Sequence, residues 1–147
     1  MSKNFKIFEI PKNIIPNLEN ENKWEKFDEE CNRRNVDLKH ILKQIIDYSN
    51  LKIEPNDMKT TVHHIIYNLK YGEYRIENHQ DFCYYTLIVY LNRDDNIEDE
   101  FYINDVLVEK HIPQIDNFRC TLFWGNSPHH GVINGIGKRQ VLCFFFD

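Results

Sequence analysis

The pattern of hydrophobic and polar positions divides the chain into two parts of different character. In the first 60 residues apolar side chains recur at helical spacing, whereas beyond them apolar and polar residues alternate as they do in β-strands. All five glycines lie at or after Gly72, and β-branched and aromatic residues dominate this second part. The pattern predicts a mainly β fold with two α-helices in the N-terminal region.

The N-terminal 60 residues are predicted to form one short strand and two helices that brace a sheet. The strand covers Phe5–Ile10 and ends where prolines follow. The first helix covers Leu18–Arg34, because Trp24, Phe27 and Cys31 fall on one face. The second helix begins at Asp37, a residue type that favours the N-cap position. Its apolar stripe consists of Leu38, Ile41, Leu42, Ile45 and Ile46.

Short strands separated by turn signals are predicted in the remaining residues. They are Thr61–Tyr71, Tyr84–Leu91, Phe101–Ile103, Val106–His111, Arg119–Trp124, His129–Ile133 and Arg139–Phe146. Strands of this length and spacing are typical of a β-sandwich or barrel. We expect a single domain over residues 1–147, with a helical support region at 1–60 and a β core at 61–147.

Composition narrows the classes of protein that the sequence fits. The chain is 41% hydrophobic and 28% charged, as expected for one globular domain. Its net charge of −5, without a basic stripe, argues against a nucleic-acid surface. Cys31, Cys83, Cys120 and Cys143 are widely spaced, which indicates free thiols in a reducing compartment. Because the sequence has no run of 18 apolar residues and no leader pattern, we expect a cytoplasmic protein without a membrane partner.

The strongest indication of chemistry is the run His79-Gln80-Asp81. Side chains two positions apart on an extended strand end point to the same side, so His79 and Asp81 can contact one ion. A histidine and a carboxylate are two members of the facial triad that holds non-haem Fe(II). The third must come from a distant strand, and the chain offers His130, 49 residues beyond Asp81. Taken alone, His-x-Asp also fits a turn with a solvated Asp and a half-buried His.

In their order and spacing these motifs resemble the Fe(II)- and 2-oxoglutarate-dependent dioxygenases, most closely the prolyl hydroxylase branch. The matching segments are Tyr71–Tyr74, His79–Asp81, Thr86–Asn92, Leu122–Trp124, His130–Val132 and Arg139. The resemblance implies a double-stranded β-helix, or jelly-roll, core. It also implies a hydroxylase that uses Fe(II), 2-oxoglutarate and O2, with ascorbate as a further cofactor that the family admits. The implied catalytic metal ligands are His79, Asp81 and His130.

Two histidines compete for the third ligand position. The family places its distal histidine two residues before a valine and about nine before an arginine. His130 has both spacings, whereas His129 misses each by one residue. A shift of one residue places a strand side chain on the opposite face, so both cannot be ligands without a bulge. The resemblance therefore selects His130 and leaves His129 pointing outward near the rim of the site.

The residues implied to bind the cosubstrate are Arg139, Tyr90 and Tyr74, with Tyr71 as the alternative to Tyr74. The guanidinium fork of Arg139 suits the far carboxylate of 2-oxoglutarate, and the phenol of Tyr90 can donate to the same group. Alternation predicts two inward-facing sets, which are Thr86, Ile88 and Tyr90, and Arg139, Val141, Cys143 and Phe145. The other interpretation of Arg139 is a structural salt bridge to an acidic loop residue.

We expect the substrate to be a prolyl residue of a protein or peptide. The acidic run Asp94–Glu100 could lie along the rim and favour a basic segment by electrostatic steering. Two other functions remain open. One is the same chemistry on a small molecule such as a free amino acid, and the other is a non-catalytic jelly-roll module that binds a metal. Nothing in the sequence specifies an oligomeric state.

Overall fold

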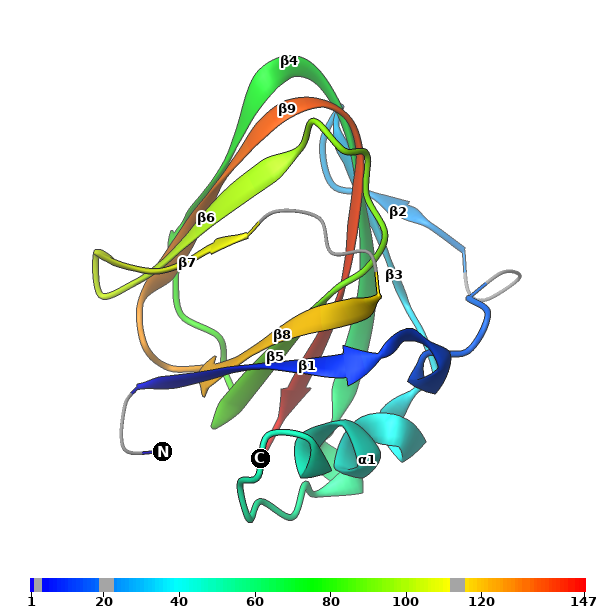
Figure 1. Ribbon diagram of the computed structural model, residues 1–147, viewed down its shortest axis with the longest axis vertical. Coiled ribbons are helices and arrows are strands. Elements are labelled where there is room, and N and C mark those ends of the chain that lie inside the picture. Colours follow the sequence, from blue (N-terminus) through cyan, green and yellow to red (C-terminus); the bar gives the residue numbers. More distant parts are fainter. Residues whose placement is uncertain (2–3, 19–22, 112–115) are drawn as a thin grey trace.

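Antiparallel β-strands make up most of the chain (Figure 1). The computed structural model describes all residues except 2–3, 19–22 and 112–115. Its strands are β1 (Phe5–Pro11), β2 (Glu25–Lys26), β3 (Cys31–Asn35), β4 (Thr61–His79), β5 (Tyr85–Tyr90), β6 (Glu98–Ile103), β7 (Val106–His111), β8 (Asn117–Trp124) and β9 (His129–Phe146). Its helices are α1 (Leu42–Asp47) and short 3₁₀ segments at Lys12–Ile14, Lys39–Ile41 and Asp57–Lys59.

Two long strands, β4 and β9, lie at the centre of the fold. They pair antiparallel from Thr61 opposite Phe145 to His79 opposite His129. In Figure 1 both strands rise along one side of the molecule, bend at the top and descend along the other side. We call this bent pair of strands the arch. Strand β9 also pairs with β5 through its C-terminal half and with β6 through its N-terminal half, so both limbs of the arch are extended into wider sheets.

Strand β4 contains two single-residue bulges relative to β9. Between positions 69 and 72, and again between 76 and 79, β4 advances three residues while β9 advances two. Each extra residue offsets the alternation by one, so that residues three positions apart across a bulge lie on the same face of the strand. Opposite the first bulge, Gly135 and Gly137 have φ angles of 123° and 130°, which favour glycine. The bulges and these glycines lie where the strands change direction and face.

The main hydrophobic core lies between the sheet and α1. Leu87 and Val89 of β5 are fully buried there, together with Leu142 and Phe144 of β9. The helix contributes Leu42, Ile45 and Ile46, which are also fully buried. Burial of an aliphatic or aromatic side chain stabilises the fold by about 1.5–3 kcal/mol. Because successive strand residues alternate between faces, the intervening residues of β5 and β9 point away from this core, into the space under the arch.

The prediction of two N-terminal helices is wrong for the first of them. In place of a helix over Leu18–Arg34, whose residues 19–22 lie outside the described part, the chain forms β2 and β3. Strand β3 pairs with β4, and this ladder overrides the local helical pattern. The expected apolar face does not form, since Phe27 is 64% exposed whereas Cys31 is buried. The second helix is confirmed in part as α1 with the preceding 3₁₀ turn.

The predicted strands agree with the structure more closely. Those at Phe5–Ile10 and Val106–His111 correspond to β1 and β7. The last two predicted strands form one continuous strand, β9. Residues 1–60 thus contribute three strands to the sheet, so this region is not the helical support that we expected.

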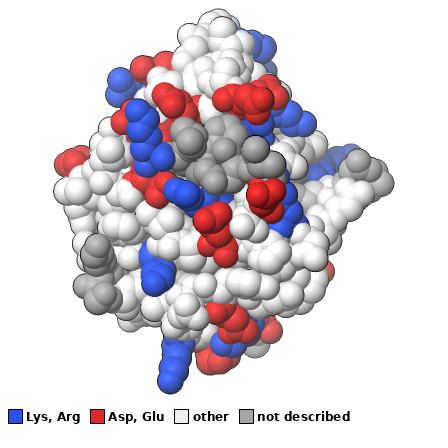
Figure 2. Space-filling view, viewed as in Figure 1, with Lys and Arg blue, Asp and Glu red and all other residues white. Residues whose placement is uncertain are grey.

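Surface features agree with the composition. On the face drawn in Figure 2, basic and acidic side chains are interspersed, in keeping with a net charge of −5. Within the described ranges, no helix combines the length and the apolar character that a membrane span requires.

Candidate metal centre and the cavity behind it

Three potential metal ligands meet where the second bulge ends β4. They are His79, the last residue of β4, Asp81, two residues further on, and His129, the first residue of β9. One ligand atom from each lies within 4.8 Å of the others. The Nε2 atoms of His79 and His129 lie 3.4 Å and 3.2 Å from the two carboxylate oxygens of Asp81. His129 is buried, whereas the side chain of His79 is 46% exposed, so the cluster lies at an opening to solvent.

Neighbouring groups orient all three side chains. The Nδ1 atoms of His79 and His129 lie 2.7 Å and 2.8 Å from the carbonyl oxygens of Glu77 and Ser127. Because a carbonyl can only accept, each Nδ1 carries a proton. Nε2 is then the atom that donates to Asp81 when the ring is protonated and that offers its lone pair to a metal when the ring is neutral. The hydroxyl of Thr86 donates to Asp81 Oδ2 at 2.7 Å. Such outer contacts are typical of metal ligands in proteins.

The electrostatics of the cluster favour a bound cation. Burial raises the pKa of Asp81, but hydrogen bonds from His129, His79 and Thr86 outweigh it and hold this pKa well below its usual range. The hydrogen bond to Asp81 raises the pKa of His79 in turn. Asp81 is therefore an anion at neutral pH, stabilised by the groups that share its oxygens. A divalent cation can take the place of the protons between these groups.

His129, and not His130, completes the cluster, contrary to the choice made from the sequence. His129 lies opposite His79 in the β4–β9 ladder, and His130 therefore points to the other face. The ring of His130 stacks on Tyr102 with centroids 4.6 Å apart, and its Nδ1 lies 4.0 Å from Asp105 Oδ1. At that distance the contact is too long for a hydrogen bond. The structure leaves His130 at the cavity wall, outside the group of ligand atoms.

A signal in the sequence could have identified His129. Since β9 is one continuous strand, period-two alternation holds from its first residue to Arg139. His129 lies an even number of positions before Arg139 and therefore shares its face, whereas His130 does not. The prediction treated the stretch as two strands and so could not carry the alternation across Gly135 and Gly137. His129 is also packed in place, with its ring centroid 4.7 Å from that of Phe123.

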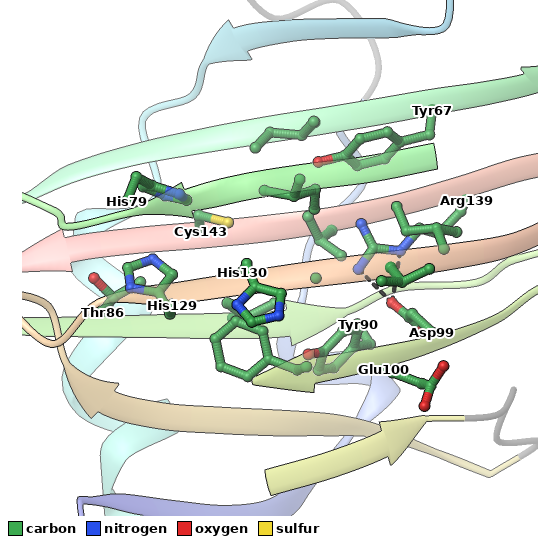
Figure 3. Close-up of a pocket in the computed structure, with 18 of the residues that line it drawn as sticks. Tyr67, His79, Thr86, Tyr90, Asp99, Glu100, His129, His130, Arg139 and Cys143 are labelled. Carbon is green, nitrogen blue, oxygen red and sulfur yellow. Dashed lines mark hydrogen bonds and ion pairs between the residues drawn. The ribbon is translucent and has the colours of Figure 1, made fainter. Parts of the chain in front are cut away.

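A cavity of about 130 Å³ extends from this cluster under the arch (Figure 3). Both inward-facing sets predicted from alternation line it, namely Thr86, Ile88 and Tyr90, and Arg139, Val141, Cys143 and Phe145. In Figure 3, His79 and His129 lie at one end, and Arg139 lies at the other end beside Tyr67 and Asp99. The alternation argument is thus confirmed for these two strands.

The guanidinium of Arg139 is already engaged by a carboxylate. Its Nε donates to Asp99 Oδ2 at 2.9 Å, and its Nη2 donates to the same oxygen. The guanidinium also lies 4.8 Å from the ring centroid of Tyr67 and 5.6 Å from that of Tyr90. Burial lowers the pKa of Arg139, but Asp99 outweighs this effect and raises it overall. The salt bridge that the sequence left as an alternative is therefore present, although the residue at its other end lies on β6.

Tyr74 and Tyr71 do not lie in the cavity. The hydroxyl of Tyr74 donates to Asp28 Oδ2, and Tyr71 is 70% exposed. The first bulge explains the outcome for Tyr71, because alternation carried past position 69 assigns it to the face of Tyr67. Tyr74, which the resemblance implied, packs on Tyr67 with ring centroids 5.2 Å apart. Tyr67, which lies opposite Arg139 in the ladder, lines the cavity in their place.

Two members of the acidic run 94–100, Asp99 and Glu100, line the cavity. Asp94 accepts from the backbone N–H of Lys138 at 2.7 Å, and Asp99 is buried against Arg139. A different acidic surface reaches the cluster. An open groove of about 830 Å³ includes His79 and Asp81 and runs along β4 toward β2 and β3. Its carboxylates besides Asp81 are those of Asp28, Glu30, Glu73 and Glu77, and its guanidinium groups are those of Arg33 and Arg75.

These observations describe a site with two approaches. A small cavity with a cationic end and a larger groove with an acidic lining meet at His79 and Asp81. The ligand set of two imidazoles and one carboxylate fits Fe(II) and leaves coordination positions open. Such a site can bring a small acid and a second, larger molecule to one metal ion.

Comparisons with solved structures give the fold a family context. A prolyl-4-hydroxylase from Pseudomonas putida superposes with a TM-score of 0.58 and 16% identity, over 84% of this chain and 76% of that one. An oxidoreductase of the 2OG-Fe(II) oxygenase family from Burkholderia pseudomallei gives 0.56 and 12%, over 85% and 71%. A Trichoplax adhaerens prolyl hydroxylase, in complex with a peptide fragment of the hypoxia inducible factor oxygen degradation domain, gives 0.55 and 17%, over 79% and 62%.

At these identities the likeness concerns the fold alone. The chain has a fold like that of the prolyl hydroxylases and of a 2OG-Fe(II) oxygenase. No model of a known protein family matches the sequence, and no curated protein sequence matches it.

Proposed function

We propose that the protein is an Fe(II)- and 2-oxoglutarate-dependent dioxygenase that hydroxylates a prolyl residue of a protein or peptide. The observation that carries this proposal is the ligand cluster at the mouth of a cavity whose other end holds a buried guanidinium. In this assignment His79, Asp81 and His129 hold the metal. Bound iron would supply the activation of O2 by which 2-oxoglutarate, O2 and R–H become succinate, CO2 and R–OH.

The chain's own residues have separate tasks in this scheme. Thr86 and the two backbone carbonyls fix the ligand side chains, so that little reorganisation is needed on metal binding. Arg139 offers the fork for the far carboxylate of the cosubstrate, with the ring of Tyr90 beside it. Apolar cavity walls, formed by residues such as Ile88 and Val141, limit the access of water.

The groove supports a substrate larger than the cavity can hold. It has about six times the cavity's volume, about 830 Å³ against about 130 Å³, and it reaches the same metal ligands. Carboxylates outnumber guanidinium groups along it, which favours a basic or neutral segment. Two of the solved structures with a like fold are prolyl hydroxylases, one of them with a peptide, which supports a prolyl substrate here.

We extend the proposal to the domain organisation. Residues 1–147 would form one domain whose arch and flanking strands constitute a double-stranded β-helix. The pairing of β1 with β8 and of β3 with β4 supports this, because it ties the N-terminal region into the same sheet as the site.

Turnover after anaerobic loading with Fe(II) tests the proposal. On addition of O2, the protein should convert 2-oxoglutarate to succinate, and a proline-containing basic peptide should increase the rate and gain one oxygen by mass spectrometry. Asp81→Ala should abolish both while the fold survives, and Asp95→Ala, an exposed change of the same charge, should alter neither. Oxygen on another residue type would overturn the prolyl assignment, and oxygen on free metabolites alone would overturn the peptide assignment. Metal binding without any consumption of 2-oxoglutarate would favour a non-catalytic module.

A further inference from the structure

Three charged side chains, Arg93, Asp99 and Arg139, form a buried cluster at the cationic end of the cavity. Their side chains are 1%, 5% and 5% exposed. Asp99 bridges the two cations, since Oδ1 accepts from Arg93 Nη1 and Oδ2 accepts from Arg139 Nε and Nη2. Two guanidinium groups and one carboxylate leave this cluster with one uncompensated positive charge. Buried charge of this kind is costly unless a counter-ion completes it.

The hydrogen-bond donors of Arg93 show where a negatively charged partner is missing. Its Nε and Nη2 are buried and have no hydrogen-bond partner among the described residues. An unsatisfied buried donor costs about 1–3 kcal/mol, and more on a charged group. Burial lowers the pKa of Arg93. The negative charge of Asp99 opposes this effect, and the positive charge of Arg139 adds to it. Arg93 therefore holds a vacant edge of its guanidinium, suited to a carboxylate in bidentate geometry.

The two guanidinium groups flank one aromatic ring. Their central carbons lie 5.5 Å (Arg93) and 5.6 Å (Arg139) from the ring centroid of Tyr90. The backbone of Asp99 is fixed in β6, where it pairs with Ile133 of β9. A transfer of the carboxylate from Arg139 to Arg93, to which Oδ1 is already bonded, would therefore need movement of side chains only.

We propose that Asp99 is a specificity-determining residue that occupies the Arg139 fork until an incoming carboxylate displaces it onto Arg93. The inference rests on the proposed function, in which the cavity receives a 2-oxo acid. Before binding, the cluster carries one excess positive charge, and a second carboxylate makes it neutral. The exchange also gives the vacant donors of Arg93 a partner. The pocket then favours an acid with a carboxylate remote from the metal over one of equal length that ends in a methyl group.

Two substitutions within the cluster should change ligand affinity in opposite directions. Asp99→Asn removes the internal competitor and should tighten 2-oxoglutarate binding at least tenfold. Arg93→Gln removes the receiving group and the excess charge, and it should weaken binding at least tenfold. Neither should change the affinity for 2-oxopentanoate, in which a methyl group replaces the far carboxylate. Asp95→Asn and Lys6→Gln are exposed changes of matched charge and should have no effect.

Isothermal titration calorimetry on Mn(II)-loaded protein measures these affinities without turnover. A structural role for Asp99 would leave 2-oxoglutarate affinity unchanged in both variants, or weakened in both, and would overturn the proposal. If wild type binds Mn(II) but no 2-oxoglutarate, the proposed function fails instead. Since Asp99→Asn leaves two cations buried together, it could fail to fold. Hydrogen exchange at Arg93 Nε–H in wild type then decides, because 2-oxoglutarate should slow it severalfold, and unchanged exchange would overturn the proposal.

Discussion

Replacement of His129 and His130, one at a time, by glutamine separates a metal ligand from its immediate neighbour. His129 supplies one of three ligand side chains, with Nε2 3.2 Å from Asp81. Loss of an outer contact to a ligand typically lowers metal affinity about 10–100-fold, so loss of the ligand itself should lower it at least about 100-fold. At about 1.4 kcal/mol for each factor of ten, this is about 2.8 kcal/mol or more. His130, whose Nδ1 lies 4.0 Å from Asp105, should change affinity less than about threefold.

Mn(II) binding, followed by calorimetry or by the electron paramagnetic resonance of free Mn(II), measures this difference, because a site of this kind binds several divalent metals. The two variants differ in packing as well. His129 is buried and its ring contacts Phe123, so its replacement should lower the free energy of unfolding by about 1–3 kcal/mol. Metal affinity is therefore compared below the melting temperature of each variant. If His130→Gln abolishes binding and His129→Gln retains it, the assignment of the ligands from the structure is refuted.

Three further outcomes follow from individual contacts. Thr86→Val removes the hydroxyl that donates to Asp81 at 2.7 Å, and calorimetry should show metal binding weakened about 10–100-fold. Unchanged affinity would show that Thr86 does not orient Asp81. Ile45→Ala, at a fully buried position of α1, should lower the free energy of unfolding in urea titrations by about 2–5 kcal/mol. Metal affinity should not change. A loss of less than about 1 kcal/mol would contradict the packing of Ile45 in the core. Burial raises the pKa of Cys31 to about 11 and that of Cys143 to about 12. Both thiols should therefore resist iodoacetamide at pH 8 in the folded state. Rapid modification of either cysteine, located by peptide mapping, would contradict their burial.

Local patterns predicted the strands well but failed where distant segments compete for the chain. Alternation correctly predicted which residues of β5 and β9 face inward. These two strands pair with each other in a regular ladder, so their side chains alternate between the two faces of the sheet without interruption. The helix expected over 18–34 failed, since the pairing of β3 with β4 outweighs a weak helical preference. Nothing within that segment indicates the partner strand, which lies some 30 residues further along the chain.

The candidate site could be predicted only as far as alternation could be followed. His79 and Asp81 were identified from their spacing, and the structure brings them together. His129 was passed over, because the resemblance selected His130 by its spacing to Val132 and Arg139. Asp99 was hidden in a run of acidic residues. Charge patterning treats such a run as a solvated loop, and only the tertiary structure shows that one member faces Arg139.

The two bulges in β4 have a consequence for the way this chain can change in length. Each adds one unpaired residue, so β4 takes twelve steps from Tyr67 to His79 where β9 takes ten from Arg139 to His129. Deletion of one residue at 70–71, or of one at 77–78, would turn that bulge into regular pairing and leave His79 opposite His129. In descendants of this sequence, single-residue gaps in β4 should therefore gather at these two places, with the meeting of the two histidines retained.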